Sequence, residues 1–187
     1  RMTIAAGDRI FIDVDPKSGK LFYAVLGFQW PDNNVPAEFM KNGVAKKPFL
    51  HYIWFFDPAS GKVEGMPVAA SNSDQVCFSQ IAVAPDGASL ALTVGAYRGN
   101  GDYETRGIFV VPSAPNSAGH IIQIFPPNAT ANFTISGLNW DPTGKKVAFG
   151  ASDKNGRLIA VVDSDGRNYK QLTKGQGNFG APKFSPQ

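Results

Sequence analysis

The chain has 187 residues, of which 43% are hydrophobic and 18% are charged, and its formal net charge is +3. This composition excludes a disordered chain or a coiled coil, and the basic residues form no stripe that could follow a nucleic-acid backbone. Valine, isoleucine and aromatic residues are favoured over leucine, which predicts an all-β fold. The sequence has no apolar run of about 18 residues, so we expect no direct membrane span.

A short motif recurs along the chain: an apolar strand, a turn that contains proline, and a second apolar strand. The turn prolines are Pro16, Pro85 and Pro142, and a fourth copy begins before Pro186. Proline fixes φ for the first turn position, and the glycine that follows accepts a positive φ. Each complete copy therefore predicts a β-hairpin.

Each hairpin is followed by two further predicted strands. The resulting four-stranded units span residues 9–70, 76–126 and 134–175. Four short strands in about 40–50 residues are typical of a β-propeller blade. The sequence thus predicts a β-propeller fragment of about three four-stranded antiparallel blades.

Partial flanking blades are expected at both ends, as strands within residues 1–5 and 180–187. A propeller ring typically needs about four to eight blades, so the remaining blades would come from the same or another chain. Because the terminal blades would expose apolar sheet faces, we expect the isolated chain not to be a stable monomer.

The third unit carries a more specific pattern. Residues 140–149, 152–156, 161–166 and 171–173 together resemble the WD40-like repeat of TolB-type propellers, and the resemblance is weaker over 9–125. It implies a non-catalytic interaction module in an extracytoplasmic bacterial protein, in the periplasm or cell envelope. The alternative is the regulatory propeller of a prolyl-oligopeptidase-type serine peptidase, whose hydrolase domain this chain does not contain.

Two insertions fall between the second and third strands of neighbouring units, at residues 28–49 and 96–106. In a propeller these connections lie on the same face, so we expect a protein-binding surface there. The first insertion could form one helical turn over 36–41, with proline at its first position. Aromatic and arginine side chains are enriched at binding hot spots. The candidate anchors in the two insertions are therefore Trp30, Phe39, Tyr97, Arg98, Tyr103 and Arg106. The competing interpretation is that Trp30, Phe39 and Met40 only pack on their own loop.

Catalytic and metal-binding patterns are weak. Ser152 lacks the closing glycine of a nucleophile elbow, and the two histidines, His51 and His120, are isolated. Residues 163–168 resemble the start of a calcium loop, but Lys174 stands where the closing acidic ligand belongs. We therefore expect no enzyme activity, metal or cofactor in this chain. Cys77 is expected to be a buried apolar residue, and glycosylation of the sequons at Asn128 and Asn132 stays open.

The hairpin motif also predicts part of the core. Apolar positions that flank the repeated turn should be buried between adjacent blades. They are Phe11, Phe22, Ile81, Val83, Trp140 and Phe149.

Overall fold

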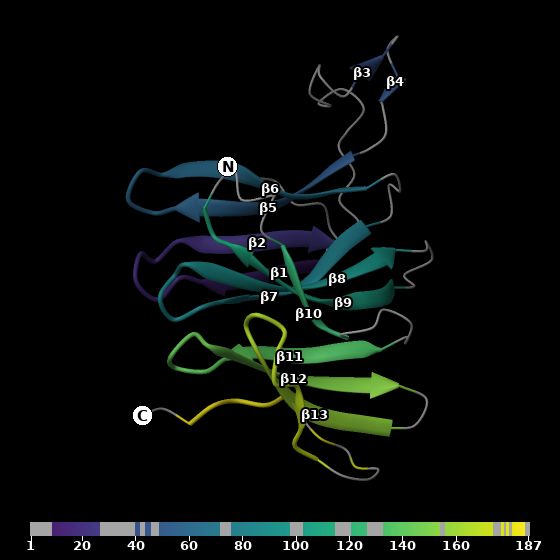
Figure 1. The fold of residues 1–187 in the computed structure, drawn as a ribbon. Helices are drawn as coiled ribbons and strands as arrows, with labels where there is room; N and C mark the ends of the chain where they lie inside the picture. The colour runs from purple at the N-terminus through teal and green to yellow at the C-terminus, as the bar shows by residue number, and fades with distance from the viewer. Residues whose placement is uncertain are drawn as a thin grey trace.

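The computed structural model describes most of the chain. The described residues are 9–26, 40–41, 44–45, 49–71, 76–97, 103–114, 121–126, 133–153, 156–173, 177, 179 and 181–185. Within these ranges the secondary structure is all strand and turn, and twelve of the strands form three four-stranded antiparallel sheets (Figure 1). Among the same residues, no helix has the length and apolar character needed to cross a membrane.

Each sheet is an antiparallel meander: the order of its four strands in the sheet is their order along the chain. The first contains β1 (Arg9–Val14), β2 (Leu21–Leu26), β5 (Phe49–Asp57) and β6 (Lys62–Ser71). The second contains β7 (Val76–Val83), β8 (Ser89–Tyr97), β9 (Tyr103–Pro112) and β10 (Ile122–Phe125). The third contains β11 (Thr134–Trp140), β12 (Lys146–Asp153), β13 (Gly156–Asp163) and β14 (Lys170–Gln171). We refer to the four strands of each sheet, in chain order, as a, b, c and d.

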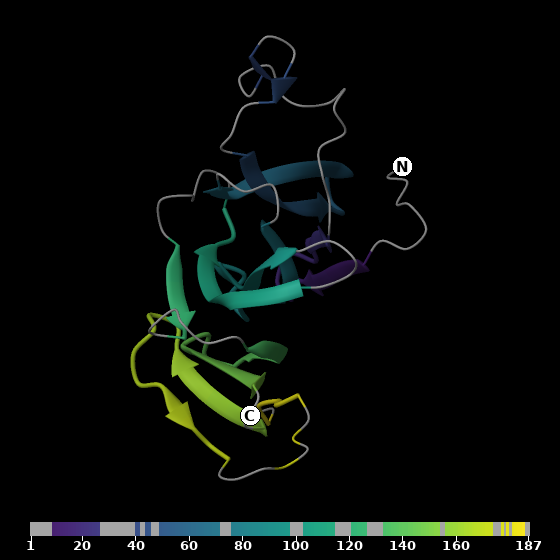
Figure 2. The same cartoon turned by 90° about the vertical axis from the view of Figure 1, so that its right-hand side faces the viewer.

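The a strands β1, β7 and β11 lie next to one another, since β7 contacts both of the others. The three a–b turns therefore lie at one edge of the molecule, and the ends of the b strands, from which the b–c connections leave, lie at the opposite edge (Figure 1). Seen from the side, the sheets follow one another from the first to the third (Figure 2). This is the arrangement of successive propeller blades, as the repeats predict.

Two apolar clusters fill the spaces between the sheets. One joins the first and second sheets around Phe22, Ile81 and Val83. The other joins the second and third sheets around Trp140 and Phe149, both of which are buried. Burial is thus confirmed for five of the six predicted core residues. Phe11 lies in β1, but its side chain is outside the described residues.

The expected flanking strands have different outcomes. Residues 1–5 lie outside the described part of the chain. Residues 181–185 have no strand assignment, yet they run beside β11, because the Phe184 N–H donates a hydrogen bond to Asn139 Oδ1 at 3.2 Å.

Candidate interaction surface

The first insertion connects β2 to β5 at the b–c edge. Its described residues form a small hairpin of β3 (Met40–Lys41) and β4 (Val44–Ala45), in which Met40 pairs with Ala45 and Lys41 with Val44. The expectation of a helical turn over 36–41 is therefore wrong for Met40 and Lys41, because their backbone groups pair across a hairpin instead. Residues 36–39 lie outside the described residues. Figure 1 shows this hairpin beyond the end of the first sheet.

The second insertion is largely an extension of two strands. β8 continues to Tyr97 and β9 starts at Tyr103, and these two residues pair directly across the ladder. The connection between the strands is therefore residues 98–102, which is shorter than the 96–106 expected from the sequence. A stiff antiparallel pair, rather than a long loop, supports the tip.

A β-bulge in β9 places Arg106 at this surface. Val94 pairs with Gly107 and Gly95 pairs with Thr105, so Arg106 is the extra residue between them. Its side chain is exposed. A Cβ at position 107 would overlap the Phe125 carbonyl oxygen, so the close approach of β10 requires glycine there.

A shallow surface depression lies beside the bulge. It is lined by Thr105, Arg106, Gly107, Phe125, Pro126, Phe133 and Ile135. Its enclosed volume is about 0 Å³, so it is a surface depression and not a pocket for a small molecule. The exposed Arg106 contributes one side of this depression.

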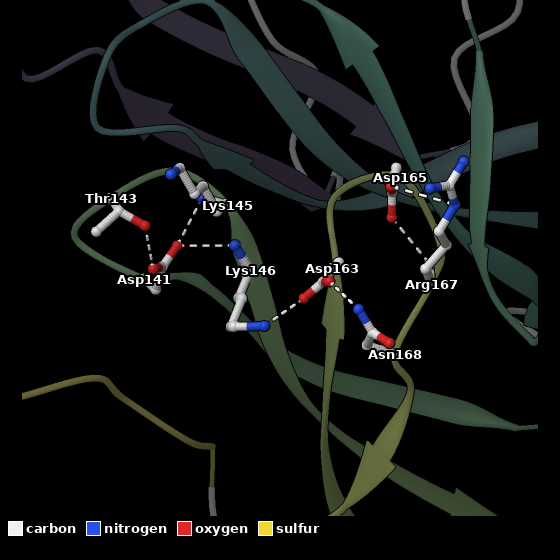
Figure 3. A network of polar contacts seen from close by, with 8 residues as sticks. All are labelled: Asp141, Thr143, Lys145, Lys146, Asp163, Asp165, Arg167 and Asn168. Carbon is white, nitrogen blue, oxygen red and sulfur yellow. Dashed lines mark hydrogen bonds and ion pairs between the residues drawn. The ribbon is translucent and has the colours of Figure 1, made fainter.

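The opposite edge is built from tight turns that are locked by aspartate side chains (Figure 3). Asp141 Oδ1 accepts hydrogen bonds from the backbone N–H groups of Lys145 and Lys146, both at 2.7 Å. Burial raises the pKa of Asp141, but the hydrogen bonds from the Thr143 hydroxyl and these N–H groups outweigh it and hold the pKa below its usual value. Asp15 occupies the equivalent place in the first sheet, with Ser18 and the Lys17 N–H as its donors.

The c–d turn of the third sheet belongs to the same network. The Lys146 ammonium donates to Asp163 Oδ1, and Asn168 Nδ2 donates to Oδ2 at 2.7 Å (Figure 3). The hydrogen bonds from Lys146 and Asn168 lower the pKa of Asp163. Protein donors thus bind the carboxylate of the calcium-like segment. Among the described residues no group of three His, Cys, Asp or Glu side chains could hold a metal ion.

The six candidate anchors are only partly visible. Trp30, Phe39 and Arg98 lie outside the described residues. Tyr97 and Tyr103 are paired at the ends of β8 and β9, although their side chains are not described. Arg106 is described and exposed, and it comes from the same β8–β9 pair. Of the other candidates, His51 lies in β5 and Cys77 in β7, both without described side chains, and His120 is outside the described residues.

Sequence reasoning missed the polar side chains that join the second and third sheets. Gln80 donates from Nε2 to the Ile135 carbonyl at 2.7 Å and accepts at Oε1 from the Leu138 N–H at 3.3 Å. The Trp140 indole N–H donates to the Ala82 carbonyl at 2.9 Å. These partners lie more than fifty residues apart, and an isolated glutamine in a strand carries no local signal for such a role.

Comparisons with known proteins bear on the fold. Neither the known protein families nor the curated proteins contain a match to the sequence. Among solved structures, the chain is similar to a TolB protein from Agrobacterium tumefaciens, with a TM-score of 0.57 and 16% identity over 95% of this chain and 50% of that chain. A chain of the nidogen/laminin complex gives a TM-score of 0.56 and 14% identity over 92% of this chain and 50% of that chain.

An ancestral GH74 enzyme is similar to the same degree, with a TM-score of 0.57 and 13% identity over 96% of this chain and 22% of that chain. The chain thus spans about half the length, or less, of the structures that it resembles. At these identities the likeness defines the fold alone. Together with the three meander sheets, it identifies a β-propeller module of the kind found in TolB.

Proposed function

We propose that this propeller module is non-catalytic and binds a protein partner through its b–c edge. One observation carries the proposal: the b–c connections of two neighbouring sheets are elaborated, whereas the a–b turns of the three sheets are short. The b–c connections of the first two sheets hold an added hairpin and an extended, bulged strand pair. The a–b turns at the other edge are short and hydrogen-bonded internally, as around Asp141.

The partner would meet a surface built on rigid strands. Tyr97 and Tyr103 stand opposite each other on a two-stranded extension, and Arg106 projects from its bulge. Such side chains give a large contact area at low entropic cost together with a polar group for hydrogen bonding. Trp30, Phe39 and Arg98 complete the proposed anchor set from the two insertions. That a similar fold occurs in the nidogen/laminin complex supports a role in protein association.

The proposal includes a periplasmic or cell-envelope setting in a bacterial protein. It rests on the resemblance of the repeats to TolB-type propellers and on the structural similarity to TolB. Fractionation of cells that express the parent protein tests it, and recovery in the cytoplasm alone would contradict it.

Photo-crosslinking tests the proposed surface. A photoreactive amino acid is placed at position 106 in one variant and at position 167 in another, because the exposed Arg167 lies at the a–b and c–d edge. We expect a protein adduct from position 106 and none from position 167. Adducts from position 167 alone would overturn the assignment. An adduct that proves to be a hydrolase domain would instead favour the peptidase-gating role.

The affinity of the partner captured in this way then tests the anchors. Arg106→Ala should weaken binding by about 2 kcal/mol if Arg106 is an anchor, whereas Arg167→Ala should leave it unchanged. Equal losses from the two variants would mean that the changes act through stability rather than contact.

A further inference from the structure

A side-chain hydrogen bond joins the a strands of the first and second sheets. Asp13 Oδ2 accepts from the backbone N–H of Val83 at 2.7 Å. Asp13 stands three residues before the turn proline of its own repeat, and Val83 stands two residues before the turn proline of the next. The bond therefore connects two defined positions of the repeat.

The same two positions are connected beyond the third sheet. Asn139 stands three residues before Pro142, and Phe184 stands two residues before Pro186. Asn139 Oδ1 accepts from the Phe184 N–H at 3.2 Å. Asn139 therefore corresponds to Asp13 both in its position in the repeat and as a side-chain oxygen acceptor, and Phe184 corresponds to Val83. Residues 181–185 therefore stand to the third sheet as β7 stands to the first.

Glycine at position 137 allows this close approach. Gly137 has a φ of +64°, and a Cβ there would overlap Ala181. Because the left-handed backbone and the lack of a side chain are both needed, the bulge in β11 is shaped to receive the segment.

Burial along the repeats agrees with this assignment. Ile81 and Val83, the positions four and two residues before their turn proline, are each 8% exposed against the first sheet. Their equivalents in β1, Ile12 and Val14, have no sheet packed on them among the described residues and are 57% and 45% exposed. Pro182 and Phe184 hold these positions in the last copy and are half-buried.

We infer that residues 181–185 are the innermost strand of a fourth blade, and that the far side of the third sheet is its docking face. That face carries Ile159 and Val161, which alternate with the buried Ala160 and Val162 and are themselves only half-buried. The occupant is thus specified: a further blade that begins with this segment and supplies three more strands.

Hydrogen exchange in the 187-residue chain tests the first half of the inference. We expect the Phe184 amide to be protected, and Asn139→Ala to speed its exchange about ten-fold, whereas Asn139→Asp keeps the acceptor and most of the protection. Gly137→Ala should also remove the protection of the Phe184 amide. Adding Ala181→Gly to that variant should restore part of the protection, because it removes the side chain that the new Cβ meets. Exchange of the wild-type Phe184 amide at the rate of an unfolded peptide would overturn the assignment.

An extended chain tests the second half. Residues 143–173, which form strands b to d of the third sheet, are appended directly after Pro186, the counterpart of Pro142. We expect the added strands to become protected and the Tm to rise by about 4 °C or more. A scrambled extension of the same composition is the control. If the unscrambled extension exchanges freely and leaves the Tm unchanged, residues 181–185 are only a packed tail.

Discussion

Among the described residues, Thr93 is the buried side chain whose polar atom makes no hydrogen bond. It is fully buried in β8, and its hydroxyl oxygen has no hydrogen-bond partner among them. It pairs with Ile108 across the ladder, on the side of the second sheet that faces the third. A hydroxyl in such a place loses its bonds to water and gains none in return.

Replacing Thr93 by valine removes the unpaired hydroxyl and keeps the branched shape. We expect Thr93→Val to raise the free energy of unfolding by about 1 kcal/mol, measured by urea denaturation. Thr93→Ala is the control and should destabilise, because it leaves a cavity. A valine variant less stable than the wild type would mean that the hydroxyl has a partner that the structure does not describe.

Asp141 makes the stability of the third sheet depend on pH. Its pKa is lower in the folded state than the ordinary value of 3.8, so the unfolded chain binds a proton more readily than the folded one. The stabilisation is therefore complete above the unfolded pKa and is lost as the pH falls through the folded value. We expect the free energy of unfolding to decrease below about pH 4, and Asp141→Asn to reduce the steepness of that decrease. Urea denaturation at several pH values measures the free energy of unfolding of both proteins. An equally steep decrease in the two would contradict this prediction.

At the scale of the element, each described a–b turn contains a glycine with positive φ, and so do the c–d turns of the first and third sheets. Gly61 and Gly87 have similar φ values, of +69° and +72°. They differ in surroundings: a Cβ at Gly61 would meet nothing within 4 Å, whereas one at Gly87 would lie 2.7 Å from Asp15 Oδ1. The pair separates backbone strain from crowding between sheets.

Alanine substitutions at these two glycines should have unequal costs. Gly61→Ala should destabilise by about 1 kcal/mol through the left-handed backbone alone. Gly87→Ala adds a clash with a carboxylate that is itself fixed by hydrogen bonds, so we expect about 2 kcal/mol or more. Thermal unfolding of both variants is the measurement. Equal losses would show that the Asp15 turn yields without cost.

The elements were predictable from the sequence because their signals are local. Proline, glycine and the apolar alternation lie within each hairpin, so the three sheets and the burial of Trp140 and Phe149 follow from them. Met40 and Lys41 were misassigned because proline at a first helical position is only a weak prior when the register of a hairpin decides otherwise. Gln80 could not be assigned, since its partners are set by how two sheets meet.

At the scale of the whole molecule, the candidate surface was predictable only in position. The edge at which the insertions lie follows from propeller topology, and the described β8–β9 pair and β3–β4 hairpin lie there. The tips themselves, residues 42–43 and 98–102, lie outside the described residues. The anchor residues Tyr97, Tyr103 and Arg106 stay predictions.

At the whole-molecule scale, the described part of the first sheet also exposes apolar side chains on the side away from the second sheet. Ile12 and Val14 are exposed there, whereas the equivalent residues of β7, Ile81 and Val83, are buried between the first two sheets. We expect concentration-dependent self-association of the isolated chain, reduced by the double change Ile12→Lys with Val14→Lys. Sedimentation velocity measures it. Val63→Lys, at an equally exposed site in β6, is the control, and an equal effect from it would point to non-specific stickiness instead.

The hydrogen bonds between sheets have a consequence for divergence. They begin on the a strands, at Asp13, Gln80, Trp140 and Asn139. None of the described residues in the b–c connections takes part in these bonds, so residues can be inserted or deleted there without changing which of these side chains meet between neighbouring sheets. Descendants of one ancestral gene can therefore differ at this edge by insertion and deletion alone, while the a strands keep their register.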